Sequence, residues 1–406
     1  MSRNQKSPSM IRLFVNALAA SAGGGLTYVR NVIPRLAERE DSHAVVLLSR
    51  PLLDEFSDYR NVTFITREVR TRGVSRLRDE QRLVRNLIGV NDSEILLSAG
   101  NFALRKSPIP QIVLSRNSLY TSRDFFHVLW TRREYRMWLD TKIKGVLAKK
   151  SVHWADRCVA PSQAFADELK KWTSVPVIAI QHGFDREIFF GDATPLSTDI
   201  QEKISLENGA LRLLFVSHYN YFRNFETLLR ALPLVKKRLA PKKVRLFLTS
   251  KLRANENPGL YRTESAAALV MNLGLRDDVV ELGAIPYRRL HHLYQACNFY
   301  VSAAYAETFA HPMVEAMACG LPVLASDIPV HREICGDAAL YFGRFDHVAL
   351  AEQIIRLAAS ESAAETLSVA GLLRSQEFSW SKHVDELITL AHQLRTQDGS
   401  TPPGLS

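Results

Sequence analysis

Two glutamates, Glu307 and Glu315, stand on either side of a predicted helix start and are the strongest chemical signal in this chain. The first follows an apolar segment that predicts a strand, and the second lies on a helix predicted over Pro312–Cys319. Pro312 suits the first turn of that helix, because its φ is preset and its missing N–H would be unpaired there. A helix N-terminus at strand ends can bind phosphate, and carboxylates accept hydrogen bonds from hydroxyls. The segment therefore predicts a site for a phosphate-linked ligand rich in hydroxyls. A buried core helix with two solvated glutamates is the alternative.

The glutamates belong to a chain that alternates short apolar segments with helical ones. In the first half the predicted strands are Ile11–Val15, Ala44–Leu48, Val62–Ile65, Ile95–Leu97, Gln111–Leu114, Arg157–Ala160 and Val177–Ile180, and the helices are Leu26–Glu38, Ser75–Leu87, Phe125–Lys149 and Gln163–Trp172. In the second half the strands are Leu211–Val216, Val244–Leu248, Val279–Leu282, Phe299–Ser302, Val323–Ala325 and Ala339–Phe342, and the helices are Asn224–Leu239, Tyr261–Leu273, Tyr287–Gln295, Pro312–Cys319, Ala349–Ala358, Ala363–Ser375 and Ser381–Thr396. This alternation indicates parallel βαβ units. We therefore predict an α/β fold of two doubly wound, Rossmann-like domains that face a central cleft, with ligands at the carboxyl ends of the strands.

The domain boundaries follow from a polar stretch in which the periodicity lapses. We expect an N-terminal domain over 1–185, a linker over 186–210 and a C-terminal domain over 211–378. The last helix, 379–396, is expected to pack back toward the N-terminal domain, and the polar tail 397–406 to be disordered.

The positive charge of the chain is concentrated in its first half. Residues 1–185 carry 29 Lys and Arg against 18 Asp and Glu, whereas the remainder carries 23 against 24. The excess lies mainly in Arg67–Arg85 and Arg132–Lys150. Such asymmetry indicates either an anionic partner, such as a membrane surface or a polyanion, or two solvated helix faces.

Composition also limits the class of protein. No apolar run approaches the roughly 20 residues that span a bilayer. The first apolar segment could be taken for a secretory signal, but Arg12 and Asn16 interrupt it, so a first strand is the better interpretation. Four widely spaced cysteines, with no Cys-x-x-Cys, indicate free buried thiols in a reducing cytoplasm.

With these elements in place, the segment Glu307–Phe342 resembles the retaining GT-B glycosyltransferases of the "glycosyl transferases group 1" family. Weaker similarities extend over about residues 10–395, and they are Gly23-Gly24-Gly25, Ala160-Pro161-Ser162, His182-Gly183-Phe184-Asp185, Leu282-Gly283 and Phe378-Ser379-Trp380. The resemblance implies a C-terminal domain that holds a nucleotide-sugar donor and an N-terminal domain that receives a hydroxyl acceptor. It also implies catalysis without a metal or other cofactor.

The resemblance assigns roles to the donor residues. Glu307 would accept hydrogen bonds from the transferred sugar, beside the backbone of Phe309, Ala310 and His311. Glu315 would accept from the two ribose hydroxyls, and Gly283 would lie in the donor loop. These carboxylates are not the acid and nucleophile of a glycosidase, because the leaving group here is a diphosphate whose negative charge must be stabilised.

Stabilisation of the leaving diphosphate falls to the loop after Leu211–Val216. The family usually has Gly-Arg, four residues and then Lys, whereas this chain has Ser217-His218, the same gap and then Arg223. Arg223 can bind phosphate bidentately. His218 is a departure: it can bind phosphate when protonated, donate a neutral hydrogen bond, or serve only in packing.

The first half contributes a second loop. Gly23-Gly24-Gly25 opens a helix after the first strand. The fingerprint of nicotinamide-binding proteins, Gly-x-Gly-x-x-Gly with an acidic residue at the end of the second strand, is disfavoured because the glycine spacing differs and Ser49-Arg50 end that strand. Close backbone approach to a diphosphate or acceptor is the better interpretation. Many family members place a histidine after the fifth strand, where this chain has Arg116 and Asn117, which we expect to line the acceptor cleft. In the front-face mechanism of retaining members, the leaving phosphate accepts the proton of the acceptor.

The sequence thus predicts a retaining, metal-independent glycosyltransferase for polysaccharide or glycolipid synthesis, with a donor linked to UDP or GDP. The expected location is cytoplasmic, and the basic first half leaves open peripheral contact with the inner face of an anionic membrane. Two other classes remain: a catalytically silent protein that binds nucleotide or sugar, and a nucleic-acid-binding protein suggested only by a pI near 9.5.

Overall fold

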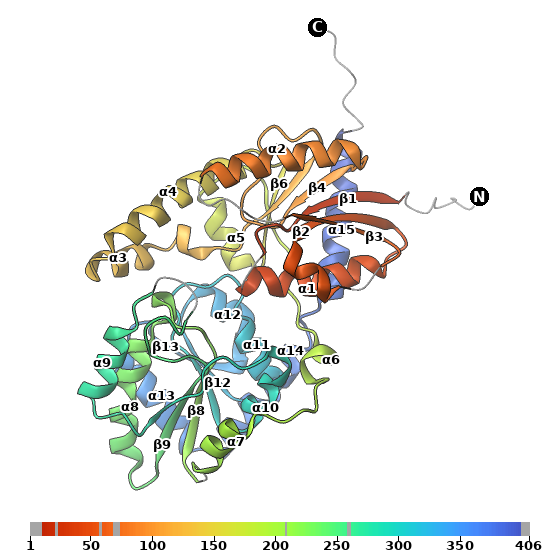
Figure 1. Cartoon of the computed structure of the whole chain (residues 1–406). Helices are drawn as coiled ribbons and strands as arrows, with labels where there is room; N and C mark the ends of the chain where they lie inside the picture. Colours follow the sequence, from red (N-terminus) through yellow and green to blue (C-terminus); the bar gives the residue numbers. More distant parts are fainter. Residues whose placement is uncertain are drawn as a thin grey trace, which may run out of the picture. The chain divides into compact units, whose positions relative to one another are not determined.

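The computed structural model describes residues 10–20, 23–56, 59–67, 74–207, 209–257 and 261–398. The chain divides into two compact units (Figure 1). The first unit comprises residues 1–121, 136–183 and 379–406, and the second comprises 122–135 and 184–378. Each unit is built on one parallel β-sheet, so the predicted α/β class with two doubly wound, Rossmann-like domains is confirmed.

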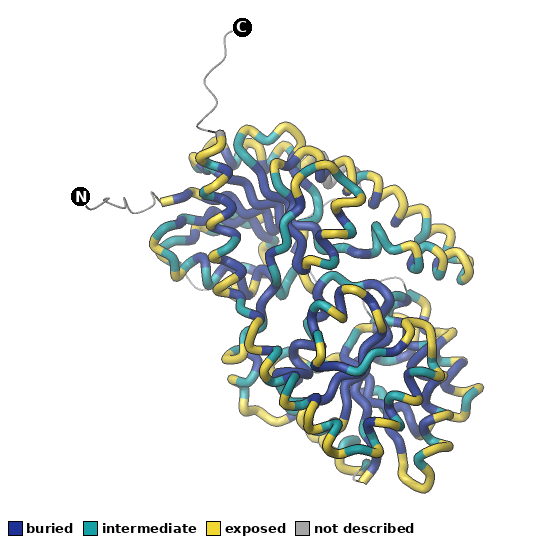
Figure 2. Tube along the Cα trace, turned by 180° about the vertical axis from the view of Figure 1, so that it is seen from behind, coloured by how far each residue is buried: buried dark blue, intermediate teal, exposed yellow. Residues whose placement is uncertain are grey.

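The first unit has a seven-stranded sheet of order β3-β2-β1-β4-β5-β6-β7. Its strands are β1 (Ile11–Asn16), β2 (Ser42–Ser49), β3 (Val62–Arg67), β4 (Ile95–Ser98), β5 (Gln111–Leu114), β6 (Arg157–Ala160) and β7 (Val177–Ala179). The central strands are apolar runs because both sheet faces are covered, as Figure 2 shows by their dark colour. The strand order reverses between β1 and β4, which pair in parallel. In open α/β sheets ligands bind at such a switch point, outside the carboxyl ends of the strands.

Helices cover this first sheet. They are α1 (Gly23–Ala37), α2 (Val74–Val90), α4 (Tyr135–Val152), α5 (Gln163–Lys170) and α15 (Trp380–Asp398), with 3₁₀ turns η1 (Arg50–Glu55) and η2 (Ser118–Tyr120). The last helix packs beside α1, and Trp380, Val384 and Leu387 join the same buried cluster as strand β1. A stripe of apolar residues at helical spacing thus fixes α15 to the first sheet.

The second unit has a six-stranded parallel sheet of order β10-β9-β8-β11-β12-β13. Its strands are β8 (Leu211–Phe215), β9 (Val244–Leu248), β10 (Val279–Glu281), β11 (Phe299–Ser302), β12 (Val323–Ser326) and β13 (Ala339–Phe342). The strand order reverses between β8 and β11, so the loops that follow these two strands flank the switch point.

Helices and short 3₁₀ turns connect the strands of the second unit. They are α3 (Arg123–Thr131), α6 (Arg186–Phe190), α7 (Thr198–Ser205), α8 (Phe225–Leu239), α9 (Glu264–Asn272), α10 (Leu290–Gln295), α11 (His311–Ala318), α12 (Pro329–Cys335), α13 (His347–Ala358) and α14 (Glu361–Ser375), with the 3₁₀ turns η3 (Tyr221–Arg223), η4 (Tyr287–Arg289) and η5 (Gly336–Ala338). Helices α8, α9 and α13 lie together, because α8 contacts both of the others.

One sequence prediction about helices was wrong. The single helix expected over Phe125–Lys149 is two helices, α3 and α4, because Arg133 has a left-handed φ of 58° that no α-helix accommodates. The break also divides the segment between units, so residues 122–135 pack with the second half of the chain. The expected linker 186–210 contains α6 and α7, and α6 begins where the Asp185 carboxylate accepts a 2.8 Å hydrogen bond from the Ile188 N–H.

Other expectations concern the chain ends and special residues. Most of the predicted tail and part of the basic segment Arg67–Arg85 lie outside the described residues. All four cysteines are free; three are buried and Cys319 is half-buried. Over the described residues, no helix is both long enough and apolar enough to cross a membrane.

Candidate active site

The two loops at the switch point of the second sheet place opposite charges in contact. Arg223 ends the turn after β8, Glu307 lies in the loop after β11, and their side chains form an ion pair. Both side chains are largely buried, with exposed fractions of 18% and 9%. Burial lowers the pKa of the Arg223 guanidinium below its ordinary value. The structure thus brings together the two residues predicted to hold the diphosphate and the sugar.

Hydrogen bonds between the loops fix this pair. The Tyr305 N–H donates to the Phe222 carbonyl at 3.0 Å, and Asn224 Nδ2 donates to the Ala303 carbonyl at 3.1 Å. Asn224 and Ala310 both have left-handed backbones, with φ of 55° and 68°. A non-glycine residue in this region costs on the order of 1–3 kcal/mol and is enriched at binding sites. The loops are therefore held in a conformation that local preference alone would not choose.

Glu315 lies on α11 and is buried, with an exposed fraction of 5%. The Tyr294 hydroxyl donates a 2.8 Å hydrogen bond to Glu315 Oε2. Burial raises the pKa of Glu315 from 4.5 to about 7, although the Tyr294 hydrogen bond acts in the opposite direction. A carboxyl in this state can accept from added hydroxyls, which would favour its ionised form. Tyr294 was not predicted to contact Glu315, because sequence spacing does not report contacts between separate helices.

A buried tyrosine connects Glu315 to the ion pair. The rings of Tyr294 and Tyr300 lie 5.9 Å apart, and the pKa of Tyr300 is raised by burial while Arg223 acts to lower it and Glu315 to raise it. Arg223 and Glu315 therefore both act electrostatically on Tyr300.

The predicted backbone contacts lie at the start of α11. Phe309 and Ala310 are buried, and His311 is the first residue of the helix. The Phe309 ring is tilted against the His311 ring, with centres 4.7 Å apart, and meets the Phe378 ring edge-on at 5.5 Å. This packing orients the N-terminus of an eight-residue helix that directly follows the Glu307 loop.

His218 lies in the loop after β8 and its side chain is exposed. Partial desolvation and then the positive charge of Arg223 lower the pKa of this imidazole below its ordinary value of 6.5, which favours its neutral form at pH 7. Gly283 follows β10 with a φ of 82°, which explains why glycine suits the position. A Cβ there would approach the Lys251 side chain at 3.2 Å.

The remaining predicted residues belong to the first unit. Arg116 Nη1 donates to the Gly24 carbonyl at 3.1 Å, Nη2 donates to the Ala99 carbonyl, and the guanidinium lies 4.6 Å from the centre of the Tyr28 ring. Burial lowers the pKa of Arg116 to about 10, so it remains charged at neutral pH. The glycine run and Arg116 thus meet at the switch point of the first sheet, where Gly25 also approaches Arg116.

Asn117 does not join that cluster through its side-chain oxygen. Asn117 Oδ1 accepts a 3.0 Å hydrogen bond from the Leu119 N–H and caps the short turn η2. Gly23 is the first residue of α1. The predicted residues therefore form two groups, one in each unit.

One buried polar pair was missed by the sequence analysis. Ser326, at the end of β12, and His331, on α12, are both fully buried, and Ser326 Oγ lies 3.0 Å from His331 Nδ1. Burial lowers the pKa of His331 to about 3, and the Arg223 charge acts in the same direction. The sequence could have indicated this pair through Ser326, a polar residue at the carboxyl end of a buried strand.

Two known protein families match parts of this chain. The family described as "Glycosyl transferases group 1" matches residues 197–374, and the family described as "Glycosyltransferase Family 4" matches residues 22–188. Together the two matches span most of both units.

Individual proteins resemble the chain over parts or all of its length. It is 33% identical over 107 residues to O-antigen chain mannosyltransferase B of Escherichia coli, covering 26% of this chain and 28% of that protein. It is 26% identical over 228 residues to alpha-monoglucosyldiacylglycerol synthase of Streptococcus pneumoniae, covering 52% of this chain and 49% of that protein. The chain thus matches half or less of the length of these relatives.

Solved structures are similar over nearly the whole chain. Sucrose-phosphate synthase from Thermosynechococcus elongatus has a TM-score of 0.75 at 19% identity, covering 95% of this chain and 100% of that one. Anabaena HepE in complex with UDP and glucose has a TM-score of 0.69 at 15% identity, covering 94% and 100%. These likenesses show the fold. The two family matches show that residues 197–374 belong to the glycosyl transferases group 1 family and residues 22–188 to glycosyltransferase family 4.

Proposed function

We propose that this protein is a retaining, metal-independent glycosyltransferase that moves a sugar from a nucleoside-diphosphate sugar to a hydroxyl acceptor. The observation that carries the proposal is the Arg223–Glu307 ion pair at the switch point of the second sheet, together with the buried carboxyl of Glu315 on the helix that follows. A cation can bind the diphosphate, one carboxylate can accept hydrogen bonds from the hydroxyls of the sugar, and the second carboxylate can accept them from the ribose.

In the proposed reaction the bond between the anomeric carbon and the β-phosphate oxygen breaks. The acceptor oxygen bonds to the same face of that carbon, and its proton passes to the leaving phosphate. Arg223 stabilises the negative charge that develops on the diphosphate, and Glu307 accepts hydrogen bonds from the sugar hydroxyls. Because Glu307 pairs with Arg223, we expect donor binding to separate the two side chains.

Relatives suggest the pathway. The similarity to an O-antigen mannosyltransferase and to a monoglucosyldiacylglycerol synthase supports transfer of a hexose in polysaccharide or glycolipid synthesis. The complexes of HepE with UDP and with UDP-glucose make a UDP-linked donor the first to test, with GDP-linked donors second.

We further propose that α4 brings the enzyme to an anionic membrane at the cytoplasmic face. One face of α4 is buried and carries Thr141, Gly145, Ala148 and Val152. Its opposite face, at about 100° per residue, exposes four apolar side chains. These are Tyr135, Leu139, Ile143 and Val146, with exposed fractions of 52%, 54%, 51% and 49%.

The charge of α4 complements such a surface. Five lysines and arginines and a single aspartate lie on the helix. An exposed apolar stripe flanked by Lys and Arg is typical of helices that lie in the interface of anionic bilayers. A lipid-linked acceptor at that surface would be consistent with the glycolipid relatives.

A transfer assay tests the catalytic proposal. Wild-type protein is incubated with UDP-glucose or GDP-mannose and a lipid extract, and the anomeric configuration of the product is read by NMR. We expect transfer with retention of configuration. The rate of transfer should fall by about 100-fold or more in Glu307→Gln, because losing one hydrogen-bond partner of the reacting group typically lowers a rate by that much. Glu352→Gln, on the exposed face of α13, is the matched control. Transfer by Glu307→Gln at the wild-type rate, or an inverted product, would refute the assignment.

Vesicle flotation tests the membrane contact separately. The full chain should bind phosphatidylglycerol vesicles more tightly than phosphatidylcholine vesicles. Replacing Leu139 and Ile143 by serine should weaken binding by about 10-fold or more, because each buried apolar side chain contributes about 1.5–3 kcal/mol. The same change at Val369 and Leu373, which are exposed at the same spacing on α14, should have no effect. Equal losses of vesicle binding in the α4 variant and the α14 variant would contradict the role of α4.

A further inference from the structure

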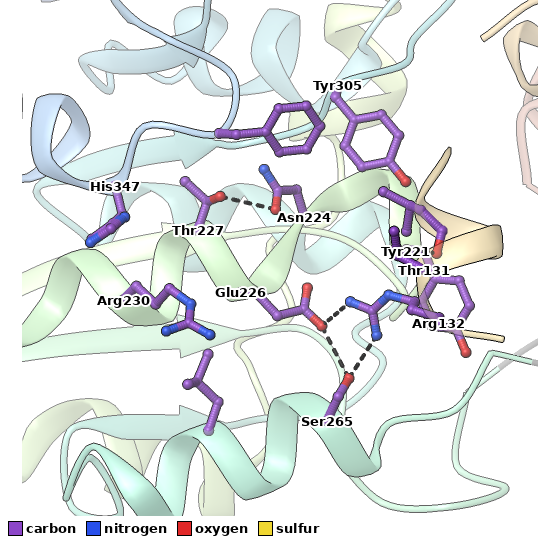
Figure 3. A pocket seen from close by; sticks show the side chains of 13 residues that line it. Thr131, Arg132, Tyr221, Asn224, Glu226, Thr227, Arg230, Ser265, Tyr305 and His347 are labelled. Carbon is purple, nitrogen blue, oxygen red and sulfur yellow. Dashed lines mark hydrogen bonds and ion pairs between the residues drawn. The ribbon is translucent and has the colours of Figure 1, made fainter. Parts of the chain in front are cut away.

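The second unit contains a pocket that the proposed reaction does not use. Its volume is about 640 Å³, and all of its lining residues belong to the second unit. The lining comes from the first turns of α8, α9 and α13, from the end of α3, and from the loop that precedes Glu307 (Figure 3). Neither Arg223 nor Glu307 is part of the lining.

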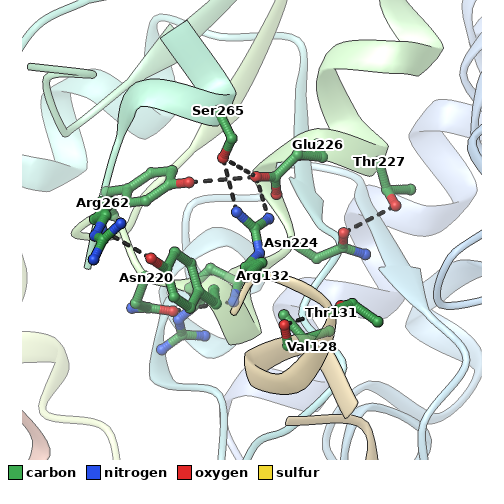
Figure 4. A network of polar contacts seen from close by, with 12 residues as sticks. Val128, Thr131, Arg132, Asn220, Asn224, Glu226, Thr227, Arg262 and Ser265 are labelled. Carbon is green, nitrogen blue, oxygen red and sulfur yellow. Dashed lines mark hydrogen bonds and ion pairs between the residues drawn. The ribbon is translucent and has the colours of Figure 1, made fainter. Parts of the chain in front are cut away.

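One wall of the pocket is a fixed polar network (Figure 4). Glu226 Oε1 accepts hydrogen bonds from Arg132, from Ser265 Oγ at 3.2 Å and from the Tyr219 hydroxyl at 3.3 Å. Arg132 also lies over the Tyr221 ring, 4.4 Å from its centre. The wall is therefore preorganised, and the second carboxylate oxygen of Glu226 has no hydrogen-bond partner among the residues that the structure describes.

Two further groups at the pocket lack partners. Only 5% of Tyr305 is exposed, yet its hydroxyl has no hydrogen-bond partner within the described part of the chain. Leaving a buried hydroxyl unpaired costs about 1–3 kcal/mol. Arg230 is exposed at the pocket, and no carboxylate of the described residues pairs with it. Figure 3 shows Arg230, Glu226 and Tyr305 around the same space.

These groups select a particular chemistry. Arg230 favours an anion, as do the starts of α8 and α9, which have no side-chain cap. Glu226 and Tyr305 offer an acceptor and a donor for ligand hydroxyls. We propose that this pocket binds a small polyhydroxylated anion of the sugar phosphate class, at a site distinct from that of the nucleotide-sugar donor.

Calorimetric titration of the full chain with glucose 6-phosphate and mannose 6-phosphate, in the presence of saturating UDP, tests the proposal. We expect at least one of them to bind with a Kd below about 1 mM. Glucose alone and inorganic phosphate alone should each bind more weakly, because each satisfies only part of the lining.

Variants locate the binding. Arg230→Ala should weaken it by about 10-fold or more, and Tyr305→Phe by about 3- to 10-fold. Arg238→Ala, an exposed arginine farther along α8, should leave it unchanged. No saturable binding of either sugar phosphate, or binding that survives both pocket variants, would overturn the proposal. Equal affinity for inorganic phosphate would also overturn it, because the hydroxyl contacts would then contribute nothing.

Discussion

The buried carboxyl of Glu315 should make the protein less stable as the pH rises through neutrality. Burial raises its pKa from 4.5, the value expected in an unfolded chain, to about 7 in the folded protein. Between these two values the folded state holds the proton and the unfolded state does not. Stability from this group is therefore fully present below about pH 4.5 and is lost as the pH rises through about 7.

The size of this loss in stability follows from the difference between the two pKa values. Each pH unit between them corresponds to about 1.4 kcal/mol. Because Glu315 is buried, solvent screening does not reduce this figure much, and the loss amounts to about 3 kcal/mol. Glu315→Gln removes the ionisation while its amide oxygen can still accept the Tyr294 hydrogen bond.

The assay is chemical denaturation of wild type and Glu315→Gln from about pH 5 to about pH 8. The difference between the two proteins isolates Glu315 from every other titrating group. We expect the glutamine variant to gain about 3 kcal/mol relative to wild type across this range. Glu352→Gln, an exposed control, should run parallel to wild type. Parallel curves for Glu315→Gln and wild type would refute the reasoning from burial.

Three further predictions concern the ion pair and a close backbone contact. Glu307→Gln should bind UDP or GDP about 10-fold more tightly in calorimetry, because Arg223 no longer has a competing carboxylate; unchanged affinity would contradict that competition. Arg223→Ala should lower the free energy of unfolding by about 3–5 kcal/mol, because it leaves Glu307 buried without a partner, whereas Arg223→Lys should retain most of the stability; equal losses would show that the pairing is unimportant. Gly183→Ala should destabilise by about 3 kcal/mol or more in thermal unfolding, because its Cβ would lie 2.0 Å from the Trp380 backbone nitrogen, whereas Gly24→Ala meets nothing within 4 Å; similar melting temperatures for the two variants would argue against the contact.

Much of the fold could be predicted because buried parallel strands are short apolar runs. Segments such as Val244–Leu248 and Phe299–Ser302 have the same bounds in the structure as in the prediction. The division between α3 and α4 could not be predicted, because Arg133 takes a left-handed backbone without the glycine or asparagine that usually signals one. Helices α6 and α7 were missed because each is a short element within a polar stretch.

The site was predictable in part. The spacing of Glu307 and Glu315 around a helix start singled out both carboxylates. The ion pair with Arg223 and the Tyr294 hydrogen bond join residues far apart in sequence, and only the order of the strands brings them together. The pocket beside α8 had no signal in the sequence, because its lining is drawn from five separate segments.

The most direct test of the central claim is calorimetric titration of UDP and GDP into wild-type protein and Arg223→Lys, Arg223→Ala and Glu315→Gln. We expect one nucleoside diphosphate to bind wild type at about micromolar strength. Its affinity should fall by about 10-fold or more in Arg223→Ala and Glu315→Gln, and by less in Arg223→Lys. Absence of binding by either nucleotide, or equal affinity in all four proteins, would contradict the assignment of the donor site to these residues.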